Sequence, residues 1–99
     1  MQPPLSSFLS ALGFAHRISA MEQFGIESMP DLELATTRLS ISDLADMLDA
    51  IQISPLEWVI TIRRSYFALR EWHLPSVYDD IVLVHQLYAK MQVFSHRRR

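Results

Sequence analysis

The stretch GIESMPDLELAT, residues 25–36, contains one of the two glycines of the chain and predicts a junction between two helices. Glycine is the preferred residue at the left-handed position that closes a helix. A serine followed by an early proline and by acidic residues is typical of a helix start, where the positive end of the dipole lies. One helix should therefore end at Gly25, and a short helix of about two turns should begin after Ser28. The residues of this stretch that we expect in the core are Ile26, Leu32 and Leu34.

Apolar residues recur at helical spacing along the rest of the chain, and no alternation long enough for a β-strand competes. We predict an all-α fold. The first helix should cover about 4–12 and the second 16–24, with Met21 and Phe24 turned inward. After the short third helix and a loop, TTRLS, a fourth helix should start at a cap formed by Ser40 or Ser42 and carry the apolar residues Leu44, Met47, Leu48 and Ile51.

The stretch SPLE, residues 54–57, predicts a capping box because serine, proline and glutamate occupy the cap, first and third positions. It should open the longest helix, which reaches about Trp72. A last helix over about 75–94 should begin at a cap formed by Ser76. Its apolar stripe consists of Val77, Ile81, Val84, Leu87, Tyr88, Met91 and Phe94. We expect this stripe to pack against the long fifth helix, the alternative being a dimer seam or a partner groove.

Composition indicates one globular domain. The chain has 99 residues, of which 49% are hydrophobic and 20% charged, and it has no cysteine. Disulfides and thiolate metal sites are therefore excluded. The N-terminal stretch does not resemble a signal peptide, and no apolar run is long enough to cross a bilayer. We expect an intracellular, cytoplasmic protein without membrane contact.

Charge is distributed unevenly along the sequence. Between Ile18 and Ile62 there are eight acids, and the only base is Arg38; from Arg63 onward the bases outnumber the acids. The acids are Glu22, Glu27, Asp31, Glu33, Asp43, Asp46, Asp49 and Glu57. Such a chain could attract another copy of itself, head to tail, or a partner of either sign. The alternative is two ordinary solvated faces.

No motif predicts catalysis or metal binding. His16, His73, His85 and His96 lie on different predicted elements, without the i, i+4 spacing of a helical metal site. The serines are mostly explained as helix caps, which leaves no Ser/His/Asp arrangement. The evenly spaced Asp43, Asp46 and Asp49 are typical of a solvated helix flank. We therefore expect a binding module that is not an enzyme and uses no cofactor or metal.

Residues 8–36 resemble the start of a sterile alpha motif (SAM) domain, a five-helix interaction module. The matching features are Phe8-Leu9, Leu12-Gly13-Phe14, the pair Gly25-Ile26 after eleven residues, and an aspartate-leucine pair within SMPDLELAT. The resemblance covers about residues 5–70. It implies a compact SAM-like bundle over 5–72, to which the last helix is added over 75–94, followed by a flexible basic tail at 95–99.

The SAM resemblance also implies protein–protein association. In that family an acidic surface on the middle helices often meets the start of the fifth helix of another domain. Carried to this chain, the acidic surface would be Asp31, Glu33, Asp43, Asp46 and Asp49, and the second surface would be Leu56, Glu57 and Trp58. The expected partner is another protein or a second copy, in an oligomer or scaffold.

A second resemblance is weaker. The stretch SISDLADMLDAIQISPLEWV is similar to the closing helices of lambda-repressor-like helix-turn-helix domains of transcription regulators. Residues 28–35 would then be the recognition helix. Because that helix carries Asp31 and Glu33 and no base, we expect weakened DNA binding and no specific duplex ligand. RNA binding would have to use a basic surface of Arg63, Arg64 and Arg70, and we do not favour it.

Overall fold

The computed structural model describes the backbone of residues 3–97 and the side chains of residues 3–91, and within this part it contains helices and no β-strand. The all-α fold class is confirmed. In chain order the elements are α1 (Leu5–Ala11), η1 (Ala15–Arg17), α2 (Ile18–Phe24), α3 (Met29–Thr37), α4 (Ile41–Ile51), α5 (Pro55–Glu57), η2 (Trp58–Arg63), α6 (Arg64–Leu69) and α7 (Val77–Arg97). η1 is a short 3₁₀ helix and η2 is a π-helical segment.

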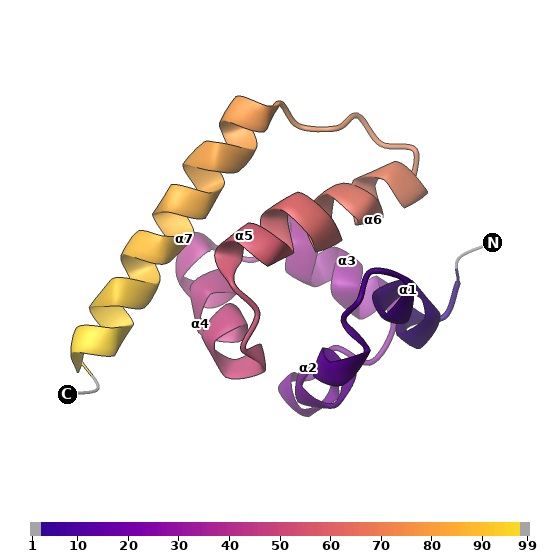
Figure 1. Cartoon of the computed structure of the whole chain (residues 1–99), viewed down its shortest axis with the longest axis horizontal. Coiled ribbons are helices and arrows are strands. Elements are labelled where there is room, and N and C mark those ends of the chain that lie inside the picture. The colour runs from indigo at the N-terminus through magenta and orange to yellow at the C-terminus, as the bar shows by residue number, and fades with distance from the viewer. Residues whose placement is uncertain (1–2, 98–99) are drawn as a thin grey trace.

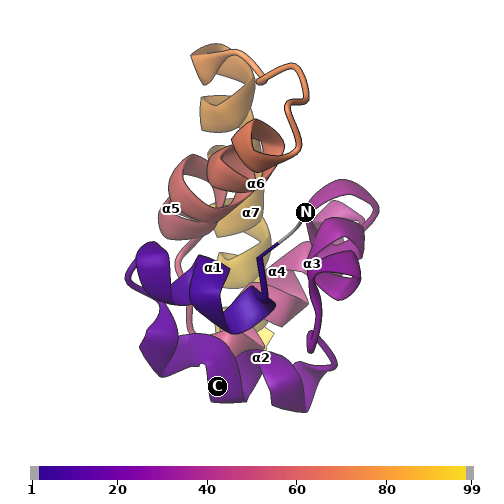
Figure 2. The ribbon, with the colours of Figure 1, turned by 90° about the vertical axis from the view of Figure 1, so that its right-hand side faces the viewer.

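Three of these elements form one rod. The backbone stays helical from α5 through η2 into α6, and Figure 1 shows the rod crossing the middle of the molecule. α1 to α4 lie on one side of the rod, and α7 is connected to the end of α6 by a loop that arches over the top. Turned by 90°, the ribbon shows α7 behind α5 and α6 (Figure 2).

The predicted helix ends are confirmed where glycine and serine determine them. Gly25 closes α2 with a φ of 105°, a conformation that costs glycine little because it has no Cβ. Ser28, Ser40 and Ser54 each accept a hydrogen bond from the backbone N–H three residues later, and at Ser54 both halves of the capping box are present. The cap of α4 is thus Ser40 rather than Ser42.

Other helix boundaries differ from the prediction. α3 continues through Thr37, whose hydroxyl donates to the carbonyl of Glu33 at 2.6 Å. α6 ends at Leu69, not Trp72, because Glu71 adopts a left-handed φ of 57° and the Trp72 N–H bonds to the carbonyl of Phe67. This is a Schellman ending at a residue other than glycine, which the sequence does not signal. The longest helix is therefore α7, with 21 residues, and it continues through Arg97.

The core lies between the rod and α1 to α4. Its largest fully buried side chains include Trp58 and Tyr66 from the rod, and Ile26 and Leu32 are buried as expected. The radius of gyration, 13.2 Å, is what a compact chain of this length should have, about 13 Å. Phe24 and Leu34 were expected in this core, but both are exposed, so that part of the prediction is wrong.

α7 packs chiefly on α4, and also touches α5 and η2. The expected packing against the fifth helix is therefore a secondary contact. Asp80 and Leu87 are completely buried and Leu83, Val84 and Met91 partly buried, whereas Val77, Ile81 and Tyr88 of the expected stripe are exposed. The buried face is thus rotated toward Asp80. The side chain of Phe94 and residues 98–99 of the expected tail lie outside the described residues.

Candidate protein-binding surface

Three bulky apolar side chains stand exposed around one hollow. Phe24, Leu34 and Leu39 keep 47%, 51% and 37% of their surface accessible, and all three line a hollow of about 190 Å³. The hollow lies between the end of α2, α3, the link before α4 and Met47 within α4. Its remaining lining residues are Gly25, Ile26, Asp31, Ala35 and Met47.

Local structure explains why these side chains reach solvent. After α2 stops at Gly25, Ile26 turns into the core and its N–H bonds to the carbonyl of Met21 at 2.8 Å. On α3, Leu32 and Ala35 are buried, so Leu34 falls on the outward side of the helix. Leu39 lies in the short link before the Ser40 cap. The end of α2, the outward side of α3 and the link before α4 therefore form an apolar surface that no other described element covers.

Asp31 places a negative charge in the wall of this hollow. One of its carboxylate oxygens accepts a hydrogen bond from the Glu27 N–H at 3.0 Å, and its own N–H donates to the Ser28 hydroxyl. The bond from the Glu27 backbone, followed by that from the Ser28 side chain, lowers the pKa of Asp31 below its usual 3.8. The carboxylate is therefore ionised at neutral pH, beside Leu34 three residues further along α3.

Of the expected acidic residues, Asp43 and Asp46 are exposed on α4. Asp43 precedes Met47 by four residues, so it lies on the side of α4 that meets the hollow. Asp49 is half-buried and has an interaction within the chain. Asp31 thus lines the hollow itself, and Asp43 lies one helical turn from the lining residue Met47.

Glu33 has a different role from the surface acid that was expected. Its Oε1 accepts a hydrogen bond from the Tyr66 hydroxyl at 2.9 Å and lies 3.7 Å from Nη2 of Arg70. Burial, followed by the hydrogen bond to Glu33, raises the pKa of Tyr66 above its usual 10.0. Glu33 therefore connects α3 to α6 within the domain. No local sequence pattern predicts this pair, because its members are 33 positions apart.

At the start of the rod, Leu56 and Glu57 are exposed and Trp58 is completely buried. The Glu57 carboxylate accepts from the Ser54 N–H at 3.2 Å as part of the capping box. The Trp58 indole N–H has no hydrogen-bond partner among the described residues. Because its side chain is inside the core, Trp58 cannot belong to the expected second surface, which reduces to Leu56 and Glu57.

The arginines expected to form a basic surface are engaged within the domain. Arg63 donates to one oxygen of the buried Asp80 at 2.8 Å, and Arg64 donates to the other oxygen. Arg64 also donates to the Pro75 carbonyl at 2.9 Å. Arg70 lies over the Trp72 ring, 5.4 Å from its centroid. This cluster connects the rod to the first turn of α7, so the interpretation as a free basic surface is wrong for Arg63 and Arg64.

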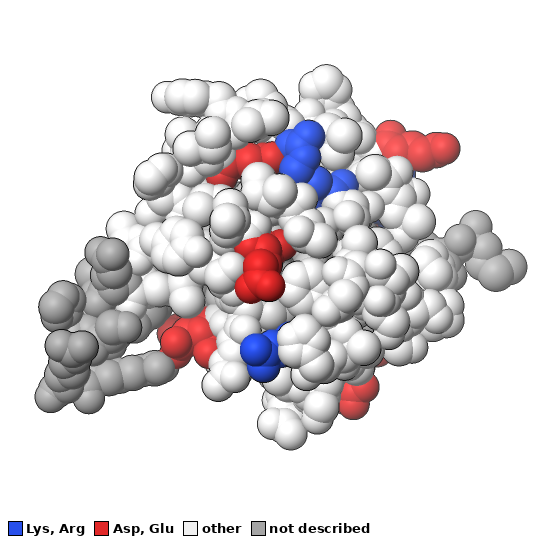
Figure 3. All heavy atoms as spheres, viewed as in Figure 1, with Lys and Arg blue, Asp and Glu red and all other residues white. Residues whose placement is uncertain are grey.

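Charge is not concentrated on the side of the molecule seen in Figure 3. There, acidic and basic side chains lie in small scattered groups, one of which joins both signs, and most of the visible surface is neither. The polarity evident along the sequence thus does not give one acidic and one basic half on this face. For binding, the charges that matter are local ones, such as those of Asp31 and Asp43 beside the hollow.

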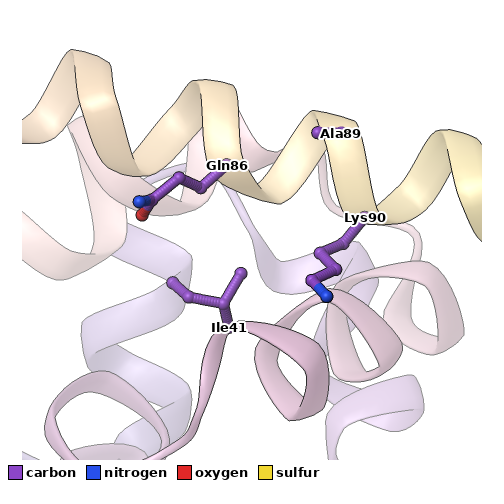
Figure 4. Close-up of a pocket in the computed structure, with 4 residues that line it drawn as sticks. All are labelled: Ile41, Gln86, Ala89 and Lys90. Atoms are coloured by element: carbon purple, nitrogen blue, oxygen red, sulfur yellow. The ribbon is translucent and has the colours of Figure 1, made fainter.

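A second groove lies between α4 and α7. Its volume is about 430 Å³ and its lining residues are Ile41, Gln86, Ala89 and Lys90. Figure 4 shows Gln86 and Lys90 reaching from α7 toward Ile41 at the start of α4. Among its described lining residues only Lys90 is charged. The apolar residues Ile41 and Ala89 make up the other half of its described lining. No exposed aromatic or leucine side chain is among these described lining residues, so this groove is the weaker candidate.

Side chains that could carry chemistry are dispersed over the described part of the chain. Among residues 3–91, no group of three or more His, Asp or Glu residues lies close enough to hold a metal ion. His16, His73 and His85 are exposed on separate segments, and the side chain of His96 is outside the described part. No helix in the described part is both long and apolar enough to span a membrane.

No protein-family model, no curated protein and no solved structure matches the chain. The compact all-helical domain is compatible with a SAM-like bundle.

Proposed function

We propose that the chain is a non-catalytic protein interaction module that binds a partner through the hollow between α2, α3 and α4. The observation that supports this most directly is that Phe24, Leu34 and Leu39 are exposed around one concave site. Single exposed apolar residues are normal on any protein, whereas grouped ones are typical of contact sites. Interface energy usually comes from a few bulky side chains seated in such pockets.

The charges around the hollow define the partner's chemistry. Asp31 is in its wall, and Asp43 and Asp46 are exposed on α4. Between Ile18 and Ile62 the sequence has a single base, Arg38. A matching partner segment carries a bulky apolar side chain for the hollow and Lys or Arg beside it. The ionic part of such a contact should weaken with salt, because these carboxylates are close to solvent.

The SAM resemblance of residues 5–70 supports the same class of function, because domains of that family are interaction modules that often associate with one another. The acidic middle of this chain fits that expectation through Asp31, Asp43 and Asp46. Glu33 and Trp58 are left out, since both are engaged inside the domain.

Selection of binding peptides from a random displayed library tests the proposal, because it does not require the natural partner. The full chain should enrich peptides that place an aromatic or aliphatic residue next to Lys or Arg. Leu34→Ser should weaken binding of the selected peptides at least tenfold. Leu69→Ser is the matched control, because Leu69 is exposed to 39% and does not line the hollow.

Asp43→Lys combined with Asp46→Lys should weaken the same peptides at low salt and much less at high salt. The proposal would be refuted by selected peptides that bind equally well to the wild type, to Leu34→Ser and to this double variant. Failure to enrich any peptide would also contradict it.

A further inference from the structure

The features expected of a partner segment, a bulky apolar side chain close to Lys or Arg, also occur within this chain. After Asp80 the sequence contains no further acid, and its four bases are Lys90, Arg97, Arg98 and Arg99. The stretch MQVFSHRRR, residues 91–99, places Phe94 just before the three arginines. Phe94 and Arg97 are three positions apart in the sequence. This stretch therefore combines a bulky apolar residue with adjacent positive charge.

The same copy of the chain cannot readily deliver this stretch to its own hollow. The backbone of α7 is one helix through Arg97, and the helix is held at Leu87 and Met91 against the domain. In Figure 1 its C-terminal end projects past α4, away from α2. Because the helix points away from the hollow of its own copy, a second copy is the source of the contact.

We propose that residues 91–99 of one copy bind the hollow of a second copy, with Phe94 between Phe24, Leu34 and Leu39 and the arginines near Asp31 and Asp43. This inference rests on the proposed function and adds the identity of the partner. The contact joins two different surfaces, so it either closes into a symmetric dimer with two such contacts or continues from copy to copy.

The size of the contact determines the expected strength. An aromatic side chain buries about 150–250 Å², well below the roughly 800 Å² per partner of a stable interface. A single contact is therefore weak and reversible, and a dimer that makes it twice is stronger. Because the arginines and carboxylates are near solvent, association should decrease as salt rises.

Sedimentation velocity on the full chain, from micromolar to submillimolar concentration, tests the proposal. The wild type and the control Leu69→Ser should associate as concentration rises, and less so at high salt. Leu34→Ser and Phe94→Ser should each weaken association about tenfold or more. Circular dichroism would establish that each variant keeps its helical content.

Mixing the two defective variants gives the sharpest result. Phe94→Ser keeps an intact hollow and Leu34→Ser keeps an intact C-terminal segment, so a mixture should form a one-to-one complex that neither forms alone. A contact between two like surfaces would not be restored in this way. Absence of a complex in the mixture, or association unaffected by Leu34→Ser, would overturn the proposal.

A synthetic peptide of residues 91–99, added to the isotope-labelled full chain, provides an independent measurement. Its amide shifts should be largest at the hollow, and a Phe94→Ala version of the peptide should bind at least tenfold more weakly. A chain that stays monomeric and ignores this peptide would refute the self-association. If library peptides still bound the hollow, the proposed function would survive that result.

Discussion

Replacing Asp80 by Asn should destabilise the domain through the two arginines that it holds. Asp80 is completely buried, and its two carboxylate oxygens accept from Arg63 and Arg64. Removing one partner of a buried ion pair costs about 3–5 kcal/mol, because the remaining charge is left uncompensated. Here the arginine side chains keep 18% and 26% of their surface exposed, and Asn can still accept a hydrogen bond. A loss of about 2–3 kcal/mol is therefore expected.

Urea unfolding followed by circular dichroism would measure this loss as a lower midpoint at an unchanged slope. By thermal unfolding the same loss corresponds to a decrease in Tm of roughly 8–24 °C for a domain of this size. Asp79→Asn is the matched control: Asp79 is the preceding residue in the first turn of α7 and is exposed, so its effect should stay within about 0.5 kcal/mol. Equal losses in the two variants would refute the assignment of Asp80 as the link between α7 and the rod.

Three further predictions concern other residues. The raised pKa of Tyr66 means that its contribution to stability is complete below pH 10.0 and is lost as the pH rises through the higher folded value; in urea titrations Tyr66→Phe should make stability less dependent on pH in that range, and an unchanged dependence would contradict this. Gly25→Ala should cost about 1–2 kcal/mol, because φ is 105° while a Cβ would meet no atom within 4 Å; an equally stable variant would show that no backbone strain is involved. Duplex DNA should not be a specific ligand, because α3 carries Asp31 and Glu33; a salt-sensitive, sequence-selective gel shift at micromolar affinity would disprove it.

Local chemistry allowed the helix ends to be predicted from the sequence. Gly25 closes α2 and the capping box at Ser54 opens the rod as predicted, because each signal depends on residues within a few positions of one another. The Schellman ending at Glu71 was missed since it contains no glycine. Such an ending depends on tertiary context more than on residue type.

The inward faces of short helices were harder to predict. Phe24 and Leu34 have helical spacing relative to buried neighbours, yet the space on their side of α2 and α3 is not filled by any described element. On α7 the attraction of Arg63 and Arg64 for Asp80 turns an acid into the core, which no hydrophobic pattern predicts. The same applies to Glu33, whose bond to Tyr66 depends on two distant helices meeting.

The candidate site was thus predictable only in part. An acidic middle region was evident from the sequence. Asp31 lines the hollow that we propose for binding, and Asp43 and Asp46 are exposed on α4. The apolar part of that surface was not predicted, because Phe24 and Leu34 were expected in the core and Leu39 in a loop. A hydrophobic residue that a short helix cannot bury is the signal that could have identified it.

Amide chemical-shift mapping with the tightest library-selected peptide would show whether the hollow between α2, α3 and α4 is the binding site. The largest shifts should fall on the residues that line the hollow, namely Phe24, Gly25, Ile26, Asp31, Leu34, Ala35, Leu39 and Met47, and Leu34→Ser should abolish them. Shifts concentrated instead along α7 and the start of α4, around Ile41 and Lys90, would contradict the account and assign binding to the other groove.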